Sequence, residues 1–303
     1  MAKINNTNEE QRLEVLKTYK IYVGGQFPRT ESGRYYVVKS KNGDHLANVC
    51  QCSRKDFRDA VLAARNAFGG WSARAAFNRG QILYRIAEML EGRKSQFVDE
   101  MTKQGLSLKQ ANEEVNLSIE RLIYYAGWCD KYQAMASTVN PVASSHFNFS
   151  SPEPTGVVSV LAPDDSPLLG LVSMMAPIIS GGNTCVILAS SKYPLSAVTF
   201  GEVLGTSDLS GGVVNILTGF VDELLPYFAD HMDVNAITLS DQSESQVTLA
   251  KEKSVFNLKR VFQYKNINWL TEKGQSPYFI LDLQEIKTTW HSIENIGGAK
   301  ASY

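Results

Sequence analysis

The chain has 303 residues, a formal net charge of -1 and 44% hydrophobic side chains. That length and apolar content are enough to bury one large core or two modest ones. The near-neutral charge gives no electrostatic reason to expect a nucleic-acid partner. The longest apolar runs are shorter than the ~20 residues that span a bilayer, and residues 1–12 contain no apolar stretch like a signal peptide. We therefore expect a cytoplasmic protein with no membrane partner.

The first part of the chain is predicted to be mostly helical. Residues 1–18 are polar and are expected to form a tail or a loose helix. Residues 20–40 read as two short strands around glycine turns. Ser53 and Asp56 resemble a capping box that starts a helix, and the glycines of "GGWS" (residues 69–72) are expected to end it. Apolar residues at helical spacing predict three further helices before residue 136.

Residues 137–156 differ in composition from the segments around them. They are poor in charge, rich in Ser and Asn, and interrupted by three prolines. The run "SSHFNFSS" alternates polar and aromatic residues, which predicts a β-hairpin with Phe147 and Phe149 on one face. An exposed, uncharged hairpin edge is an association site for another chain. We therefore predict that this hairpin projects and that Phe147 and Phe149 belong to an interface.

From residue 157 onward, short apolar strands alternate with helix-like segments. This alternation is typical of crossover connections and of a parallel sheet with helices on both faces. The predicted fold is therefore α/β, a doubly wound Rossmann-like sheet over residues 157–303, preceded by the helical segment. Sheets of this kind bind ligands at the carboxyl ends of their strands.

Cysteine and histidine give no sign of a metal site. Cys50 and Cys52 are two residues apart in a predicted strand, but no second Cys or His pair with zinc spacing exists. They are interpreted as small buried side chains in a reduced protein. Cys185 falls in a core strand, and the four histidines are scattered.

Several long blocks resemble the aldehyde dehydrogenase superfamily. They are "TGVVSVLAPDDSPLLGLVSMMAPIISGGNTCVIL", "GGVVNILTG" after it, and "AVLAARNAFGGWSARAAFNRGQILYRIAEML" before it. Their order matches the family over roughly residues 19–283. The chain is most similar to the degenerate second domain of family 16 aldehyde dehydrogenases. The resemblance implies that residues 19–136 are the helical part of a cofactor domain, that residues 137–156 form an oligomerisation hairpin, and that the catalytic domain is absent.

The resemblance places changed residues at the family's catalytic positions. The family's oxyanion Asn, in "PWNFP", corresponds to Asp165 in "PDDSP". An ionised carboxylate cannot donate a hydrogen bond to an oxyanion. Helix capping is an alternative explanation for Asp164 and Asp165. The family's general-base Glu corresponds to Tyr264 in one alignment register and to Thr271 in another, because residues 262–275 contain an insertion. The adjacent Glu272 is interpreted as a surface acid, and no cysteine matches the family's nucleophile.

The family's NAD(P) contacts are changed as well. Ala189 and Lys192 stand where the family has the Lys and Glu of "KPSE" for the adenosine ribose. Asp241 and Gln246 replace both glycines of "FTGSTEVG", where a helix N-terminus receives the pyrophosphate. Lys192 could favour a 2′-phosphate, but three changed contacts together argue against dinucleotide binding. Asp241 and Glu244 are expected in the first helical turn, where they would satisfy the helix dipole themselves. No cofactor is therefore expected.

Two functions follow from different classes of protein. The favoured one is a pseudoenzyme, a scaffold or partner subunit for a catalytically complete aldehyde dehydrogenase chain, with a homodimer as the fallback. The alternative is an NAD(P)-binding subunit of an aldehyde-oxidising enzyme whose active site is shared with another chain. A decaying gene product without a role is less consistent with the well-patterned helices.

Overall fold

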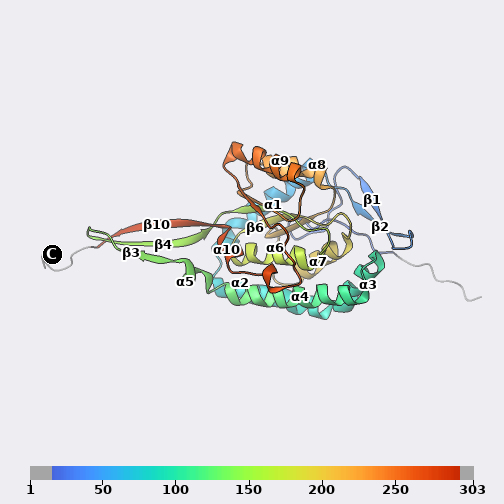
Figure 1. Ribbon diagram of the computed structural model, residues 1–303, viewed down its shortest axis with the longest axis horizontal. Coiled ribbons are helices and arrows are strands. Elements are labelled where there is room, and N and C mark those ends of the chain that lie inside the picture. Colours follow the sequence, from blue (N-terminus) through green and yellow to red (C-terminus); the bar gives the residue numbers. More distant parts are fainter. Residues whose placement is uncertain (1–15, 294–303) are drawn as a thin grey trace, which may run out of the picture.

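A five-stranded parallel sheet lies at the centre of the molecule. The computed structural model describes residues 16–293, and Figure 1 shows a layered α/β body from which a narrow second sheet projects. The strand order is β7-β6-β5-β8-β9, with every pair parallel. The strands are β5 (Val157–Leu161), β6 (Thr184–Leu188), β7 (Val214–Leu217), β8 (Ala236–Leu239) and β9 (Arg260–Gln263). This order, with β5 at the centre, confirms the predicted doubly wound sheet.

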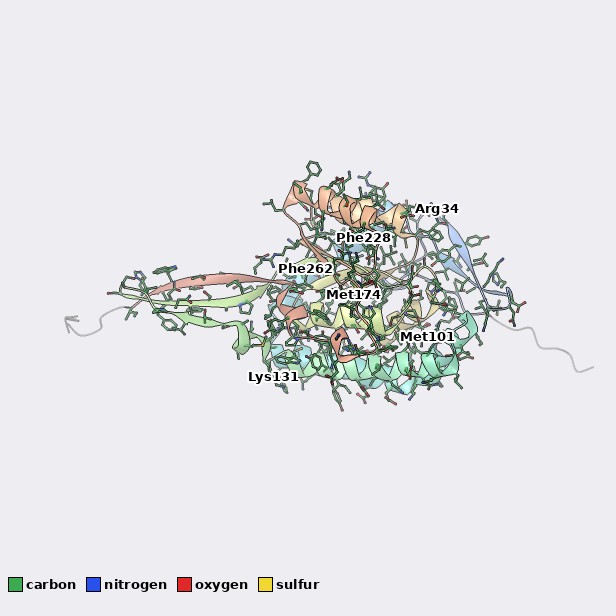
Figure 2. All side chains as sticks on the ribbon, viewed as in Figure 1. Arg34, Met101, Lys131, Met174, Phe228 and Phe262 are labelled. Atoms are coloured by element: carbon green, nitrogen blue, oxygen red, sulfur yellow. The ribbon has the colours of Figure 1, made fainter. Side chains whose placement is uncertain are left out.

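Helices cover both faces of this sheet. Helices α6 (Leu169–Ser180) and α7 (Leu195–Gly205) pack on one face, and α1 (Arg54–Ser72), α8 (Val221–Asp230) and α9 (Glu244–Ser254) cover the other (Figure 1). Figure 2 labels one side chain from each of the two resulting cores, Met174 and Phe228. Strands β5, β6, β7 and β8 are buried at every position, because helices lie on both sides.

The predicted end of the first helix at "GGWS" is wrong, because α1 continues to Ser72. Gly69 and Gly70 lie on its exposed side, where an added Cβ would contact nothing. Trp71 is buried, and its indole N–H donates a 3.0 Å hydrogen bond to the carbonyl of Ile179. The packing of this one large side chain outweighs the helix propensity that two glycines remove, about 1 kcal/mol each.

A further layer of helices packs against α6 and α7. It comprises α2 (Ala76–Gly92), α3 (Lys94–Gln104), α4 (Leu108–Trp128) and the short α5 (Tyr132–Ala136). The antiparallel pair β1 (Tyr35–Lys39) and β2 (His45–Cys50) lies at the other end of the body from the projecting sheet (Figure 1). The remaining short elements are η1 (Val255–Asn257), η2 (Glu272–Gly274) and α10 (Tyr278–Leu281). Within residues 16–293, no helix is both long and apolar enough to cross a membrane.

The projecting element has three strands, so the predicted two-stranded hairpin needs correction. Strands β3 (Thr138–Asn140) and β4 (His146–Pro154) do pair, but β10 (Gln284–Ser292) pairs along the whole other side of β4. The prediction assigned residues 157–303 to the Rossmann-like part. Residues 284–292 belong instead to the projecting sheet. The strand that carries the two phenylalanines is central, and the free edges belong to β3 and β10. The predicted tail at residues 1–18 lies largely outside the described residues.

Phe147 and Phe149 share one face of the projecting sheet, with ring centroids 5.6 Å apart. Phe147 is 45% exposed. The opposite face of β4 carries Asn148 and Ser150, both buried by a polar network. The Asn140 amide donates to Asn148 Oδ1 (2.6 Å) and to Ser150 Oγ (2.9 Å). Hydrogen bonds thus join the polar side chains on this face of β4, and the same face of the sheet carries Ile286 and Trp290 of β10, both exposed.

Asp56 connects the N-terminal segment to the start of α1. Its carboxylate accepts hydrogen bonds from the hydroxyl of Thr30 (2.6 Å) and the amide of Glu31 (3.0 Å). It also accepts from the amide (2.7 Å) and hydroxyl (2.9 Å) of Ser53, which confirms the predicted capping box. Burial alone would raise the pKa of Asp56, but these hydrogen bonds outweigh it and hold the pKa below its ordinary value.

Replacing Asp56 by Asn should lower the free energy of unfolding at neutral pH by about 1–3 kcal/mol, because an amide NH₂ would face hydrogen-bond donors. The carboxylate's contribution is complete above its unfolded pKa of about 3.9 and is lost as the pH falls through the lower folded value. Urea denaturation across this range should show the difference between wild type and variant shrinking in acid. The matched control is Asp59→Asn on the exposed side of α1; equal effects of the two substitutions would contradict the assignment.

Candidate functional site

The two acids of the turn after β5 have separate partners. The carboxylate of Asp164 accepts hydrogen bonds from the hydroxyl of Ser190 (2.8 Å) and the amide of Ser191 (3.0 Å), so it joins this turn to the loop after β6. Asp165 is almost fully exposed and lies 3.5 Å from Lys192 Nζ. Neither acid caps α6, so the capping explanation for them is wrong. Asp165 and Lys192, from two different altered motifs, form one exposed ion pair.

The N-terminus of α6 is capped by a residue that sequence reasoning missed. Glu114 reaches it from α4 and accepts hydrogen bonds from the amides of Leu168 (3.2 Å) and Leu169 (2.8 Å) and from the hydroxyl of Ser166 (2.6 Å). Burial raises the pKa of Glu114, and the three hydrogen bonds lower it only in part. The sequence did hold a sign of this contact, because Glu114 is a carboxylate on the buried face of α4, three residues after Ala111 and four before Ser118.

The N-terminus of α9 carries a capping box made by its own side chains. Helix α9 begins at Glu244 with Ser243 as N-cap. The side chain of Ser243 accepts from the amide of Gln246, and Gln246 Oε1 accepts from the amide of Ser243 (3.0 Å). The same Gln246 donates from Nε2 to Asp222 on α8 (2.7 Å), which bridges the first turns of two helices.

Asp241 does not lie in the first turn of α9, contrary to expectation. It precedes the N-cap, and its carboxylate accepts a 2.8 Å hydrogen bond from the amide of Asn266. Glu244 is in the first turn, as predicted, and forms an ion pair with Lys265. Ala189 is buried at the end of β6, with its amide bonded to the carbonyl of Leu217 (2.9 Å). Asp241, Glu244 and the amide of Ala189 therefore all have partners within the chain.

The two candidates for the general base, Tyr264 and Thr271, lie in different surroundings. Tyr264 follows β9, packs against Phe279 with ring centroids 4.8 Å apart, and donates to Asp282 (3.1 Å). Burial raises the pKa of Tyr264, so it stays a neutral phenol. Thr271 is exposed in the inserted segment, where its hydroxyl donates to the carbonyl of Asn268 (2.8 Å). Glu272 is exposed, as expected of a surface acid.

The inserted segment is fixed to the body by a buried arginine on α4. Arg121 donates to the hydroxyl of Ser173 (2.9 Å), the carbonyl of Gly274 and the carbonyl of Trp269 (3.1 Å). Trp269 is 5% exposed and packs in the same core as α4 and α6. Burial lowers the pKa of Arg121, and these acceptors compensate for the loss of water around the guanidinium.

One cavity of about 640 Å³ unites several of these residues. Asp165, Lys192 and Asp241 line it together with Glu114 and Trp269, whereas Ala189, Gln246, Tyr264 and Thr271 do not. All four cysteines are buried, and burial raises the pKa of Cys129 to about 11 and that of Cys185 still further. No cysteine lines this cavity, and residues 16–293 contain no cluster of three metal-ligating side chains.

Five parallel strands in this order, with loops meeting at their carboxyl ends, define a Rossmann-like α/β protein. The aldehyde dehydrogenase family model matches residues 27–264. The chain therefore belongs to the aldehyde dehydrogenase family.

Curated relatives and solved structures agree with this assignment. The chain is 32% identical to retinal dehydrogenase 2 of Gallus gallus, over 81% of this chain and 48% of the relative. It is 27% identical to mitochondrial 10-formyltetrahydrofolate dehydrogenase of Homo sapiens, over 91% of this chain and 30% of that protein. The structure of PnpE from Pseudomonas sp. WBC-3 superimposes with a TM-score of 0.78 at 28% identity, over 82% of this chain and 50% of PnpE. The chain thus spans half the length of its relatives or less.

Replacing Arg121 by Met should lower the free energy of unfolding by about 2–4 kcal/mol, because two buried backbone carbonyls lose their donor. It should also free the inserted segment, which contains Lys265 and Lys273, for cleavage by trypsin. Limited proteolysis followed by mass spectrometry measures this directly. The control is Arg85→Met, which removes an arginine from an exposed ion pair on α2. A segment that stays as resistant in Arg121→Met as in the control would show that Arg121 does not hold it.

Proposed function

We propose that this chain is a catalytically inactive aldehyde dehydrogenase homologue that acts as a scaffold or partner subunit in the cytoplasm. We further propose that it is most similar to the degenerate second domain of family 16 aldehyde dehydrogenases. The observation that carries the proposal is the capping box at the N-terminus of α9, in which Gln246 stands where the family has a glycine. A free helix N-terminus attracts phosphate through its unpaired N–H groups, and here Ser243 and Gln246 satisfy one another and Gln246 also binds Asp222.

The catalytic positions support the same proposal. Asp165 has no donor for an oxyanion, and its charge would oppose the negative charge that develops there; one missing donor costs about 3–4 kcal/mol of transition-state stabilisation. Tyr264 is engaged with Asp282, and Thr271 has no acid–base character near neutral pH. All four cysteines are buried and none lines the cavity, whereas acyl transfer needs an accessible thiolate.

One observation favours the alternative, an NAD(P)-binding subunit with a shared active site. The 640 Å³ cavity remains open at the carboxyl end of the sheet, and Lys192 lines it. The buried hydroxyl of Ser240 and indole N–H of Trp269, two other lining residues, have no hydrogen-bond partner in residues 16–293. A ligand could satisfy them. Binding of NAD or NADP therefore separates the two functions.

We predict no binding of NAD or NADP at micromolar concentrations, because the α9 terminus is self-capped and Asp241 would repel a phosphate. Titration calorimetry of the full chain measures this, with PnpE as the positive control. Micromolar affinity for either cofactor would favour the alternative function. If weak binding is found, Asp241→Gly should strengthen it; an unchanged affinity would show that the phosphate position is assigned incorrectly. In the same samples, a short aldehyde should produce no NADH above a blank without protein.

The projecting sheet is the proposed site of the partner. The aromatic face of β4 is open, with Phe147 and Phe149 side by side. Val139 on β3 lies opposite Phe149 and is 67% exposed. Exposed apolar residues of this kind, on a sheet that protrudes from the body, are typical of association surfaces. We propose that this sheet associates with a catalytically complete aldehyde dehydrogenase chain, with a symmetric homodimer as the second choice.

Replacing Phe147 and Phe149 by Asp should abolish association, because two carboxylates would lose their water in the interface. Size-exclusion chromatography with light scattering should give the monomer mass for the variant, alone and mixed with the candidate partner. The control is Phe77→Asp, an exposed phenylalanine on α2. If the double variant assembles as the wild type does in both samples, the sheet is not the interface.

A further inference from the structure

A second cavity lies at the opposite end of the molecule from the projecting sheet. It has a volume of about 420 Å³, within the range of small-molecule sites, and shares no lining residue with the cavity described above. Strand β2 provides one wall, residues 16–20 a second and residues 29–35 a third. Strands β1 and β2 mark its position in Figure 1.

The charge around this cavity is of one sign. Five of its lining residues are basic and none is acidic; the basic ones are Lys17, Lys20, Arg29, Arg34 and His45. Two of them are neutralised by carboxylates outside the cavity. Lys17 lies 3.2 Å from Glu100 and 2.9 Å from Glu202, and Arg34 pairs with Glu223.

Lys20 and Arg29 are not neutralised. Within residues 16–293, neither side chain makes an ion pair or a hydrogen bond. The two lie on different walls, since Lys20 belongs to the N-terminal segment and Arg29 to the loop before β1. Two unpaired cations facing a common space attract an anion of one or two charges.

The remaining lining is largely apolar. Leu16 and Tyr35 are 59% and 60% exposed at the rim, and Leu46, Ala47 and Cys50 continue the apolar surface along β2. Inorganic ions gain nothing from such a wall, whereas a molecule with a hydrocarbon or aromatic body would bury apolar area there. The combination therefore selects an amphipathic anion over a free ion.

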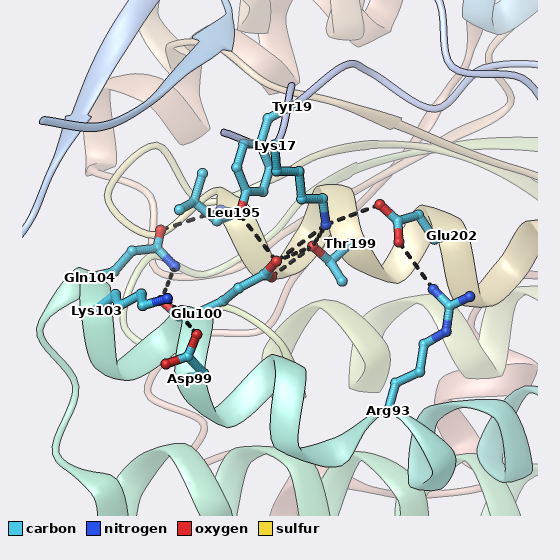
Figure 3. Close-up of polar contacts among 10 residues, drawn as sticks. All are labelled: Lys17, Tyr19, Arg93, Asp99, Glu100, Lys103, Gln104, Leu195, Thr199 and Glu202. Carbon is cyan, nitrogen blue, oxygen red and sulfur yellow. Dashed lines mark hydrogen bonds and ion pairs between the residues drawn. The ribbon is translucent and has the colours of Figure 1, made fainter. Parts of the chain in front are cut away.

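The wall formed by residues 16–20 is held in place before any ligand arrives. Figure 3 shows Lys17 between Glu100 of α3 and Glu202 of α7, with Tyr19 beside it. The Tyr19 hydroxyl donates to Glu100 (3.1 Å), and Thr199 donates to the same carboxylate (2.6 Å). A site that is already ordered loses less conformational entropy on binding.

We propose that this cavity binds a small organic anion, a carboxylate on an apolar body, with Lys20 and Arg29 as the charge contacts. The proposal does not depend on the function assigned to the carboxyl end of the sheet. Binding requires no chemistry and no cofactor. The chain would then bind a ligand at this cavity whether or not it binds the family's cofactor.

Octanoate is a suitable probe, measured by titration calorimetry on the full chain. We expect saturable one-to-one binding that weakens as salt is added, and no binding of octylammonium or octanol at the same concentrations. The double variant Lys20→Gln, Arg29→Gln should lose affinity at least about tenfold. The control, Lys39→Gln with Lys41→Gln, removes the same charge from exposed positions around the β1–β2 turn and should bind as the wild type does.

Three results would overturn the proposal. They are no binding of octanoate by the wild type at millimolar concentration, equal binding of octylammonium or octanol, and equal loss of affinity in the two double variants. Because all four substituted side chains are exposed or half-buried and lie outside the core, circular dichroism should show that both variants fold.

Discussion

The carboxylate of Glu114 at the N-terminus of α6 is the contact on which the arrangement of the sheet's carboxyl end depends. The first N–H groups of a helix have no partner within the helix. Here Glu114 takes two of them, at Leu168 and Leu169, and so fixes the turn that leads out of β5. Two helical turns further along α4, Arg121 holds the inserted segment around Trp269. Helix α4 thus positions two walls of the 640 Å³ cavity, the turn after β5 and the inserted segment.

Other polar groups at this end of the sheet also form hydrogen bonds within the chain. Asp164 bonds the loop after β6, and Ser243 and Gln246 close α9. An anionic ligand at the N-terminus of α9 would compete with a helix cap worth about 1 kcal/mol and would meet the carboxylate of Asp241. The fold of the family is kept, and several polar side chains at this end of the sheet bond within the chain. Fold and function are separable in this way because a site depends on few side chains.

The sequence was a good guide to the elements and a poor guide to their polar contacts. Apolar periodicity predicted the five strands and the helices that cover them, because burial on both faces leaves a strong pattern. Glu114 and Arg121 were missed because their partners are 52 to 153 residues away in the chain. Strand β10 was missed although Ile286, Thr288 and Trp290 share one face, because its partner β4 is far away in the chain and the pairing is decided by tertiary structure.

Positions within the candidate site show the same limit. Asp241 was expected in the first turn of α9 but precedes the helix, because Ser243 is the N-cap. The insertion after β9 could not be aligned from the sequence, since its register depends on how Trp269 packs in the core. Helix caps could be predicted where both partners are close in sequence, as for Ser53 and Asp56.

Hydrogen–deuterium exchange of the segments 161–169 and 238–247, with and without saturating NAD, tests the central claim most directly. If the chain's own side chains satisfy the N-termini of α6 and α9, the amides of Leu168, Leu169 and Gln246 should exchange at the same slow rate in both samples. Added protection of these amides by NAD would show that the helix ends still receive a phosphate, and the chain would then be a cofactor-binding member of its family.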